Sequence, residues 1–121
     1  MTMRVTRIAD AEPFSPVGHS GVGPVRLQGG TSTPTSDLTV ALSHYLPGGS
    51  AELAPQEAET VYVVLSGELA MTAEGDDQIL SAFDSVHFTP GTLRTVENRT
   101  HLPATMLVIR ATPYRQNLRT V

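Results

Sequence analysis

The stretch at residues 48–69, GGSAELAPQEAETVYVVLSGEL, decides the fold. Glycines stand at its two ends, at Gly48 and Gly67, and the β-branched run TVYVVL leads into the second glycine. β-Branched and aromatic residues favour strands, whereas glycine interrupts them or bends them. The stretch therefore predicts a strand that begins near Thr60 and ends near Gly67.

Short strands and turns follow one another on both sides of this stretch. Residues 38–46, LTVALSHYL, alternate in the period of two that a half-buried strand requires, and we expect PGGS at 47–50 to end that strand. ELAMT followed by AEGDDQ predicts a strand entering a tight hairpin turn. DSVHF, LRTVEN and ATMLVIRA are further strands, and glycine, proline or β-branched residues interrupt every candidate helix. The chain is predicted to be all-β.

Composition limits the remaining choices. At 121 residues the chain is the size of one domain, and no apolar run approaches the ~20 residues of a membrane helix. The absence of cysteine excludes disulfides and thiolate chemistry, and the start of the chain lacks the order of a secretory signal. We therefore expect a cytoplasmic protein. A net charge of -4 with scattered arginines argues against binding to nucleic acid.

Residues 1–37 differ in composition from the rest. Their segment EPFSPVGHSGVGPVRLQGGTSTPTSD is rich in glycine, proline, serine and threonine. Such a composition indicates a long arm, with a short strand near VRLQ, rather than a second domain. The predicted organisation is an arm at 1–37 and a barrel core at 38–121.

Two spaced motifs link this pattern to a known family. Gly48 and Gly67 match the glycines of G-x5-H-x-H-x3-E-x6-G, and Gly91 and Asn98 match the end of G-x5-P-x-G-x2-H-x3-N. The chain thus resembles the cupin family over about residues 38–110. The resemblance implies a double-stranded β-helix, or jelly-roll, barrel. It also implies a homodimer, because cupins commonly pair through their sheets.

The residues that bind the metal in this family are replaced. Ala54 and Gln56 stand at the two histidine positions, Thr60 at the glutamate position and Arg94 at the last histidine position. Alanine has no donor atom, Gln56 and Thr60 are weak neutral ligands, and arginine repels a cation. We therefore expect no metal cofactor at the usual cupin position.

A relocated metal site remains an alternative. Glu52, Glu57 and Glu59 lie in the same stretch, and His44, His87 and His101 lie elsewhere in the barrel. On an unslipped strand, however, Glu59 has the opposite parity to Thr60 and would point away from the pocket.

The candidate site residues follow from the motif positions and from strand parity. Arg94, Gln56 and Thr60 are predicted to bind a ligand. His44 and Tyr62 are the candidate proton-transfer residues, with a glutamate as the alternative. His44 shares a face with Leu38, Val40 and Leu42, so it is either a pocket acid or base or a hydrogen-bonded core histidine. Packing is the alternative role for Tyr62. His87 is assigned to the surface or to an interface, His19 and His101 to loops, and Asn98 to the cap of a turn.

Arg94 carries the functional prediction. A guanidinium inside a barrel is costly unless it is paired, so it requires either an internal carboxylate or an anionic ligand. We therefore expect a small anionic partner, bound without metal. Two functions remain open: an enzyme that isomerises, dehydrates or cyclises a small organic acid, and a non-catalytic module that binds or stores it.

Overall fold

The computed structural model describes residues 2–112, and nearly all of this range is strands and turns. Residues 113–121, the end of the predicted barrel core, lie outside the described part. The elements are η1 (Ile8–Asp10), β1 (Glu12–Pro13), β2 (His19–Gln28), β3 (Leu38–Pro55), β4 (Thr60–Ser66), β5 (Leu69–Ala73), β6 (Asp76–Leu80), β7 (Ser85–Phe88), β8 (Leu93–Glu97) and β9 (Ala104–Ala111). Within residues 2–112, no helix is long and apolar enough to cross a membrane.

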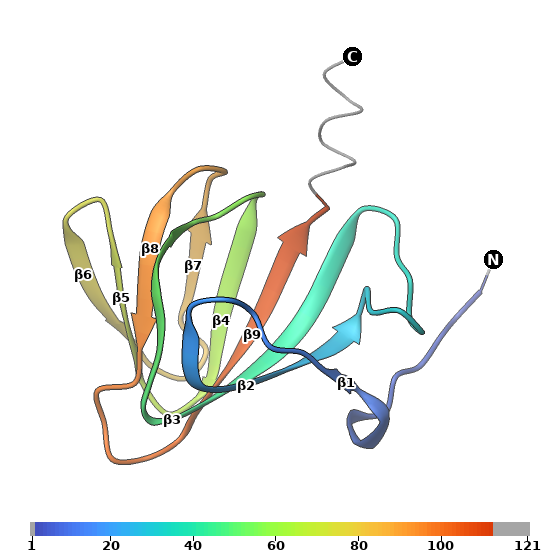
Figure 1. Cartoon of the computed structure of the whole chain (residues 1–121), viewed down its shortest axis with the longest axis horizontal. Coiled ribbons are helices and arrows are strands. Elements are labelled where there is room, and N and C mark those ends of the chain that lie inside the picture. The colour runs from blue at the N-terminus through green and yellow to red at the C-terminus, as the bar shows by residue number, and fades with distance from the viewer. Residues whose placement is uncertain (1, 113–121) are drawn as a thin grey trace.

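The strands form a nearly closed jelly-roll barrel, as predicted. The hydrogen-bonded order is β6-β5-β8-β3-β9-β4-β7, with β2 added on β3 and β1 on β2, and every pair is antiparallel. Two walls face each other across the interior (Figure 1). One wall holds β5, β6 and β8, the other holds β4, β7 and β9, and β3 belongs to both.

The long strand β3 joins the two walls, which corrects the prediction that PGGS ends it. Its first half, Leu38 to Tyr45, pairs with β9, and its second half, Ser50 to Pro55, pairs with β8. Gly48 has a φ of 80°, a conformation that residues with a Cβ rarely adopt. The glycine bends the strand from one wall into the other instead of terminating it.

The tight hairpin predicted in AEGDDQ lies between β5 and β6. Its two turn residues, Glu74 and Gly75, have φ values of 54° and 80°. Positive φ at both central positions defines the type I′ turn, whose twist matches that of the flanking strands. Leu69 then pairs with Leu80 at the far end of the hairpin.

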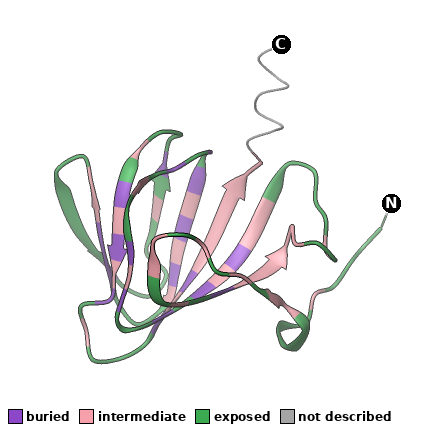
Figure 2. Ribbon diagram, viewed as in Figure 1, coloured by how far each residue is buried: buried purple, intermediate pink, exposed green. Residues whose placement is uncertain are grey.

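The predicted inward face of residues 38–46 is wrong. Ala41, Ser43 and Tyr45 are buried, whereas His44 is exposed and Leu38 retains 45% of its accessible surface. The outward row holds the large apolar residues Leu38, Val40 and Leu42, whereas the buried row includes the small or polar Ala41 and Ser43, so hydrophobicity alone indicated the wrong face. The buried rows of the strands are the purple bands in Figure 2.

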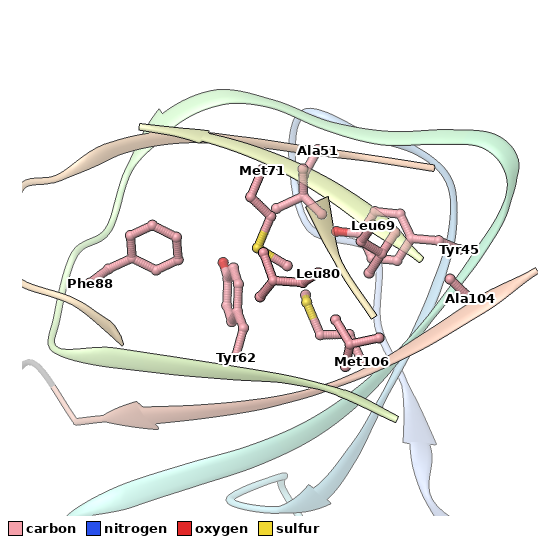
Figure 3. Packing of buried hydrophobic residues seen from close by; sticks show 11 residues of the cluster. Tyr45, Ala51, Tyr62, Leu69, Met71, Leu80, Phe88, Ala104 and Met106 are labelled. Carbon is pink, nitrogen blue, oxygen red and sulfur yellow. The ribbon is translucent and has the colours of Figure 1, made fainter. Parts of the chain in front are cut away.

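The core lies between the two walls. Tyr62 and Phe88 meet edge to face, with ring centroids 5.2 Å apart, and the other large members are Tyr45, Val64, Leu69, Met71, Leu80, Val96 and Met106. Tyr62 rises from β4 into the interior toward these side chains (Figure 3). Burial of a side chain of this size contributes about 1.5 to 3 kcal/mol.

The N-terminal arm is part of the sheet. β2 is longer than the short strand predicted near VRLQ, because it begins at His19 and pairs with β3 from Ala51 to Val40. Pro24, within β2, is buried. The arm therefore extends the sheet beside β3.

Candidate functional site

A cavity of about 230 Å³ lies between the N-terminal arm and the barrel. Its polar lining comes from β2, β3, β4, β8 and β9 and from the loop after β3, and the residues with polar or charged side chains are His19, Arg26, Ser43, Tyr45, Gln56, Glu57, Tyr62, Arg94 and Arg110. This volume lies below the roughly 300 to 1,000 Å³ of sites for drug-sized ligands, so the space is enough only for a small molecule.

Arg94 is buried in this lining, with 6% of its surface exposed. It lies opposite Ala54 on β3 and Ala73 on β5, two small residues beside which a large side chain fits. Its Nε donates a hydrogen bond to the Tyr62 hydroxyl at 3.1 Å, and its Nη1 donates to the Glu52 carbonyl at 2.9 Å. Among residues 2–112, none provides a carboxylate within ion-pair distance of Arg94.

The orientation of Gln56 follows from its partners. Arg110 Nη2 lies 3.2 Å from Gln56 Oε1, and a guanidinium can only donate, so the atom facing it is the amide oxygen. The amide nitrogen therefore faces Tyr62 and donates to its hydroxyl at 2.7 Å. The Tyr62 oxygen accepts this bond and the one from Arg94, and neither uses the proton of the phenol itself.

Thr60 and Arg110 complete the network. They are cross-strand partners on β4 and β9, and Arg110 Nε donates to Thr60 Oγ1 at 3.3 Å. Thr60 Oγ1 also lies 2.9 Å from the Ala58 carbonyl, which accepts its proton. Gln56, at 2% exposure, connects Arg110 to Tyr62 and Arg94. Three of the four former metal-ligand positions, all but Ala54, thus share one hydrogen-bonded network.

Two further basic residues face the cavity from the arm. Arg26 stacks its guanidinium on Phe14, 3.8 Å from the ring centroid, and partial burial followed by the charge of Arg110 lowers its pKa. Partial burial also lowers the pKa of His19, and the positive charges of Arg94 and Arg110 lower it further. The cavity is therefore electropositive, and His19 favours the neutral form.

The structure brings four of the five predicted site residues together. Gln56, Thr60, Tyr62 and Arg94 contact one another, directly or through one partner. His44 is separate from them, because it lies on the outer face of β3 and its Nδ1 is 3.2 Å from Thr105 Oγ1. The prediction that His44 faces the interior was wrong, because the opposite face of its strand is the one that is buried.

Sequence reasoning missed Arg110, Arg26 and His19 as site residues. A signal for Arg110 exists, since it shares parity with the buried Ala104 and Met106 along β9. His19 was assigned to a loop but begins β2 and lines the cavity. No local pattern marks Arg26, because its place in the site depends on the pairing of β2 with β3.

The remaining sequence assignments concern residues outside the buried network. Glu59 points outward as expected, and its Oε2 is 2.8 Å from Nε2 of His87 on the surface. Asn98 closes a turn as expected, donating to the carbonyls of Tyr45 and Leu102 and accepting from Thr100. Glu52 and Glu57 are exposed. In the described part of the chain, no three histidine or acidic residues are grouped closely enough to hold a metal ion.

The comparison with protein families identifies the class. A family model described as the cupin domain matches residues 41–110, more than half of the chain. The chain therefore belongs to the cupin family. Beta-D-galactosidase Rv1717 of Mycobacterium tuberculosis is similar to it, with 45% identity over 111 residues that make up 92% of this chain and 96% of that protein.

Solved structures support the same fold. The polyketide cyclase RemF of Streptomyces resistomycificus superimposes with a TM-score of 0.79 at 15% identity, covering 91% of this chain and 80% of that one. A predicted oxalate decarboxylase of Thermotoga maritima gives 0.76 at 24% identity, covering 90% and 98%. Identities this low establish the architecture alone.

Proposed function

We propose that this protein binds a small organic acid in the cavity without a metal ion, with Arg94 as the principal anchor. The observation that carries the proposal is a buried guanidinium for which no residue within 2–112 supplies a carboxylate. An unpaired buried charge is costly, and an anionic ligand would offset that cost. A carboxylate can accept two charge-assisted hydrogen bonds from one guanidinium.

Tyr62 is the proton-transfer group in this proposal. Its oxygen accepts hydrogen bonds from Gln56 and Arg94, so its own proton is available to a ligand in the cavity. Donors aimed at the same oxygen also stabilise the phenolate that remains after the proton leaves. This arrangement suits isomerisation, dehydration or cyclisation of an organic acid, reactions that require a proton to be placed and removed.

The binding test compares Arg94→Met with Arg99→Met in a thermal-shift panel of small carboxylates. Arg99 is an exposed arginine that pairs with Asp77 and Glu97, so its variant controls for the loss of a positive charge. We expect carboxylates to raise the melting temperature of the wild type and of Arg99→Met, and not that of Arg94→Met. Arg94→Gln, which keeps a polar end, repeats the test if the methionine variant unfolds.

Fold stability separates ligand binding from a structural role of Arg94. Arg94 donates two hydrogen bonds and forms no ion pair within the described chain, and its removal also relieves the cost of a buried charge. The loss of stability should therefore stay below the ~3 to 5 kcal/mol of a broken buried ion pair. A carboxylate panel that stabilises none of the proteins would overturn the proposed function. Elemental analysis that finds one transition metal per chain would overturn its metal-free character.

A second candidate function is hydrolysis of β-galactosides, which the 45% identity to a β-D-galactosidase over nearly both whole chains favours. Most glycosidases use a pair of carboxylates, and some use a tyrosine nucleophile instead. Of the described residues that line the cavity, Glu57 alone has a carboxylate. In this candidate Tyr62 is the nucleophile and Glu57, at the rim, is the acid.

Nitrophenyl β-D-galactoside and the matched β-D-galacturonide test the second candidate. Release of nitrophenol by the wild type, lost in Tyr62→Phe and Glu57→Gln and retained in Arg99→Met, would support hydrolysis at this cavity. Activity that survives both substitutions would place hydrolysis elsewhere and contradict the candidate. A preference for the galacturonide would join the two functions, because its carboxylate matches the arginines.

A further inference from the structure

The positive charges around the cavity are not concentrated at one point. Arg94 lies on β8, whereas Arg110 lies on β9 and Arg26 on β2. Tyr62 and Gln56 separate Arg94 from Arg110, through contacts of 3.1 Å, 2.7 Å and 3.2 Å in sequence. The cavity therefore has two cationic ends with a neutral polar bridge between them.

Each guanidinium has donors that the network does not use. Arg94 commits Nε and Nη1, and Arg110 commits Nε and Nη2, which leaves Nη2 of Arg94 and Nη1 of Arg110 without a partner among residues 2–112. The side chain of Arg26 is held by stacking on Phe14 and has no hydrogen bond to another side chain or carbonyl within the same residues. The committed donors fix the planes of Arg94 and Arg110, and the unused donors remain for a ligand.

The formal charge of the lining indicates how many acidic groups the ligand has. Three arginines contribute +3 and Glu57 contributes -1, so the described lining carries +2 with His19 neutral. Arg26 and Arg110 are close enough for the charge of Arg110 to disfavour the charged form of Arg26, and an anion between them would relieve this repulsion. A ligand with one negative charge would neutralise only half of the site.

We propose that the cavity takes a small dianion whose two acidic groups are separated by a short chain, one group held by Arg94 and the other by Arg26 and Arg110. The inference rests on the proposed function, which requires only one acidic group at Arg94. The chain between the two groups would then lie across Tyr62 and Gln56. Dicarboxylates and phosphorylated carboxylic acids share this chemistry.

Calorimetric titration with matched anions tests the number and the separation of the acidic groups. Butyrate and succinate have the same chain length with one and two carboxylates, 3-phosphoglycerate represents the phosphorylated acids, and inorganic phosphate concentrates its charge at one point. We expect succinate or 3-phosphoglycerate to bind at least about tenfold more tightly than butyrate and phosphate, since an additional charge-assisted contact contributes that much.

Two variants test whether the preference for a diacid depends on the cationic end formed by Arg26 and Arg110. Arg110→Met should weaken succinate binding at least tenfold more than butyrate binding, and so remove the preference for the diacid. Gln56→Glu should weaken diacid binding at least tenfold while stabilising the free protein, because its carboxylate would pair with Arg110, the present partner of Gln56 Oε1. Arg99→Met, on the surface, should match the wild type.

The outcomes distinguish this inference from the proposed function. Equal affinities for butyrate and the diacids would overturn the proposal of a dianionic ligand and leave the proposed single-acid site intact. Phosphate binding as tight as that of the best diacid would overturn the inference that the two acidic groups of the ligand are separated by a chain. A protein that binds none of the four anions would overturn both proposals.

Discussion

At the scale of single residues, the four metal-ligand positions of the family carry other residues here, while the spaced motif glycines remain. Gln56 and Thr60 are nearly completely buried and retain hydrogen-bonding roles, and Ala54 makes room opposite Arg94. A cation site needs converging anionic or imidazole donors, whereas this network presents guanidinium N–H groups to the cavity. In the proposed function the charge of the ligand is therefore reversed, from a metal cation to an organic anion.

The pKa of His19 reflects its partial burial and the positive charge of the cavity lining. Partial burial lowers the pKa of its imidazole below 6.5, a backbone contact with Val17 opposes the change, and Arg94 and Arg110 add to it. Because the unfolded chain then binds the proton more readily than the folded chain, His19 destabilises the fold as pH falls through about 6.5 toward the lower folded pKa. His19→Gln should remove this part of the pH dependence.

Two measurements check the expectation for His19. NMR titration should give the His19 ring a pKa below 6.5 in the free protein, with assignment from the His19→Gln spectrum. Addition of a bound anion should raise that pKa, because the anion offsets the arginine charges. A value at or above 6.5 without ligand, or urea melts whose acid dependence is the same in the wild type and the variant, would contradict this account.

At the scale of elements, β3 and β2 position the site. The bend at Gly48 lets β3 supply Ser43 and Tyr45 to one wall and Gln56, just past its end, to the other side of the cavity. β2 crosses close to this bend, where Gly21 approaches Gly49. Side chains of β2 therefore line the cavity, although composition predicted only an arm for this segment.

Gly49→Ala should disturb this crossing. A Cβ at residue 49 would collide with the Gly21 carbonyl and lie 2.9 Å from the Leu46 carbonyl, both of them backbone atoms. We expect a loss of about 1 to 3 kcal/mol in the free energy of unfolding, as for other overpacked sites. Chemical denaturation should measure this loss. Carboxylate binding should also weaken, because β2, which bears Arg26, must shift.

Gly23→Ala is the matched control on β2. A Cβ there meets nothing within 4 Å, and the φ of Gly23 is not in the positive region. Its stability should equal or slightly exceed that of the wild type, since alanine restricts the unfolded chain more than glycine does. Equal stabilities of the two alanine variants would show that the crossing is not tightly packed.

At the scale of the whole molecule, the outer face of the wall containing β3, β4 and β9 is strongly apolar. Cross-strand partners bring one row of side chains together, Val25, Leu42, Val63 and Leu107, and a second row beside it, Val40, Val61 and Ile109. All seven are half-buried by their neighbours. Apolar rows of this kind favour contact with a second apolar surface.

We expect a homodimer that pairs through this face. Light scattering at micromolar concentration should give twice the 12.9 kDa mass of the chain. Leu107→Glu should yield a folded monomer, because it places a charge in the middle of the apolar rows without touching the cavity lining. A wild type that is monomeric at that concentration would contradict the expectation.

The sequence by itself determined the architecture and the loss of the metal ligands. Motif spacing from Gly48 to Gly67 and the positions of Gly91 and Asn98 reflect local turns, which depend on backbone conformation and can be recognised from neighbouring residues. The replacements at Gln56, Thr60 and Arg94 are equally readable, because a ligand's chemistry resides in its own side chain. These local features are what a linear pattern records.

Only the tertiary structure decided which face of residues 38–46 turns inward, and so excluded His44 from the cavity. It also decided that Arg26 and Arg110 join Arg94, because their approach depends on the register of β2 on β3 and of β9 on β4. Register is set by packing across the barrel, between residues distant in the chain. The charge of the site is a sum over such residues, so no single stretch of sequence contains it.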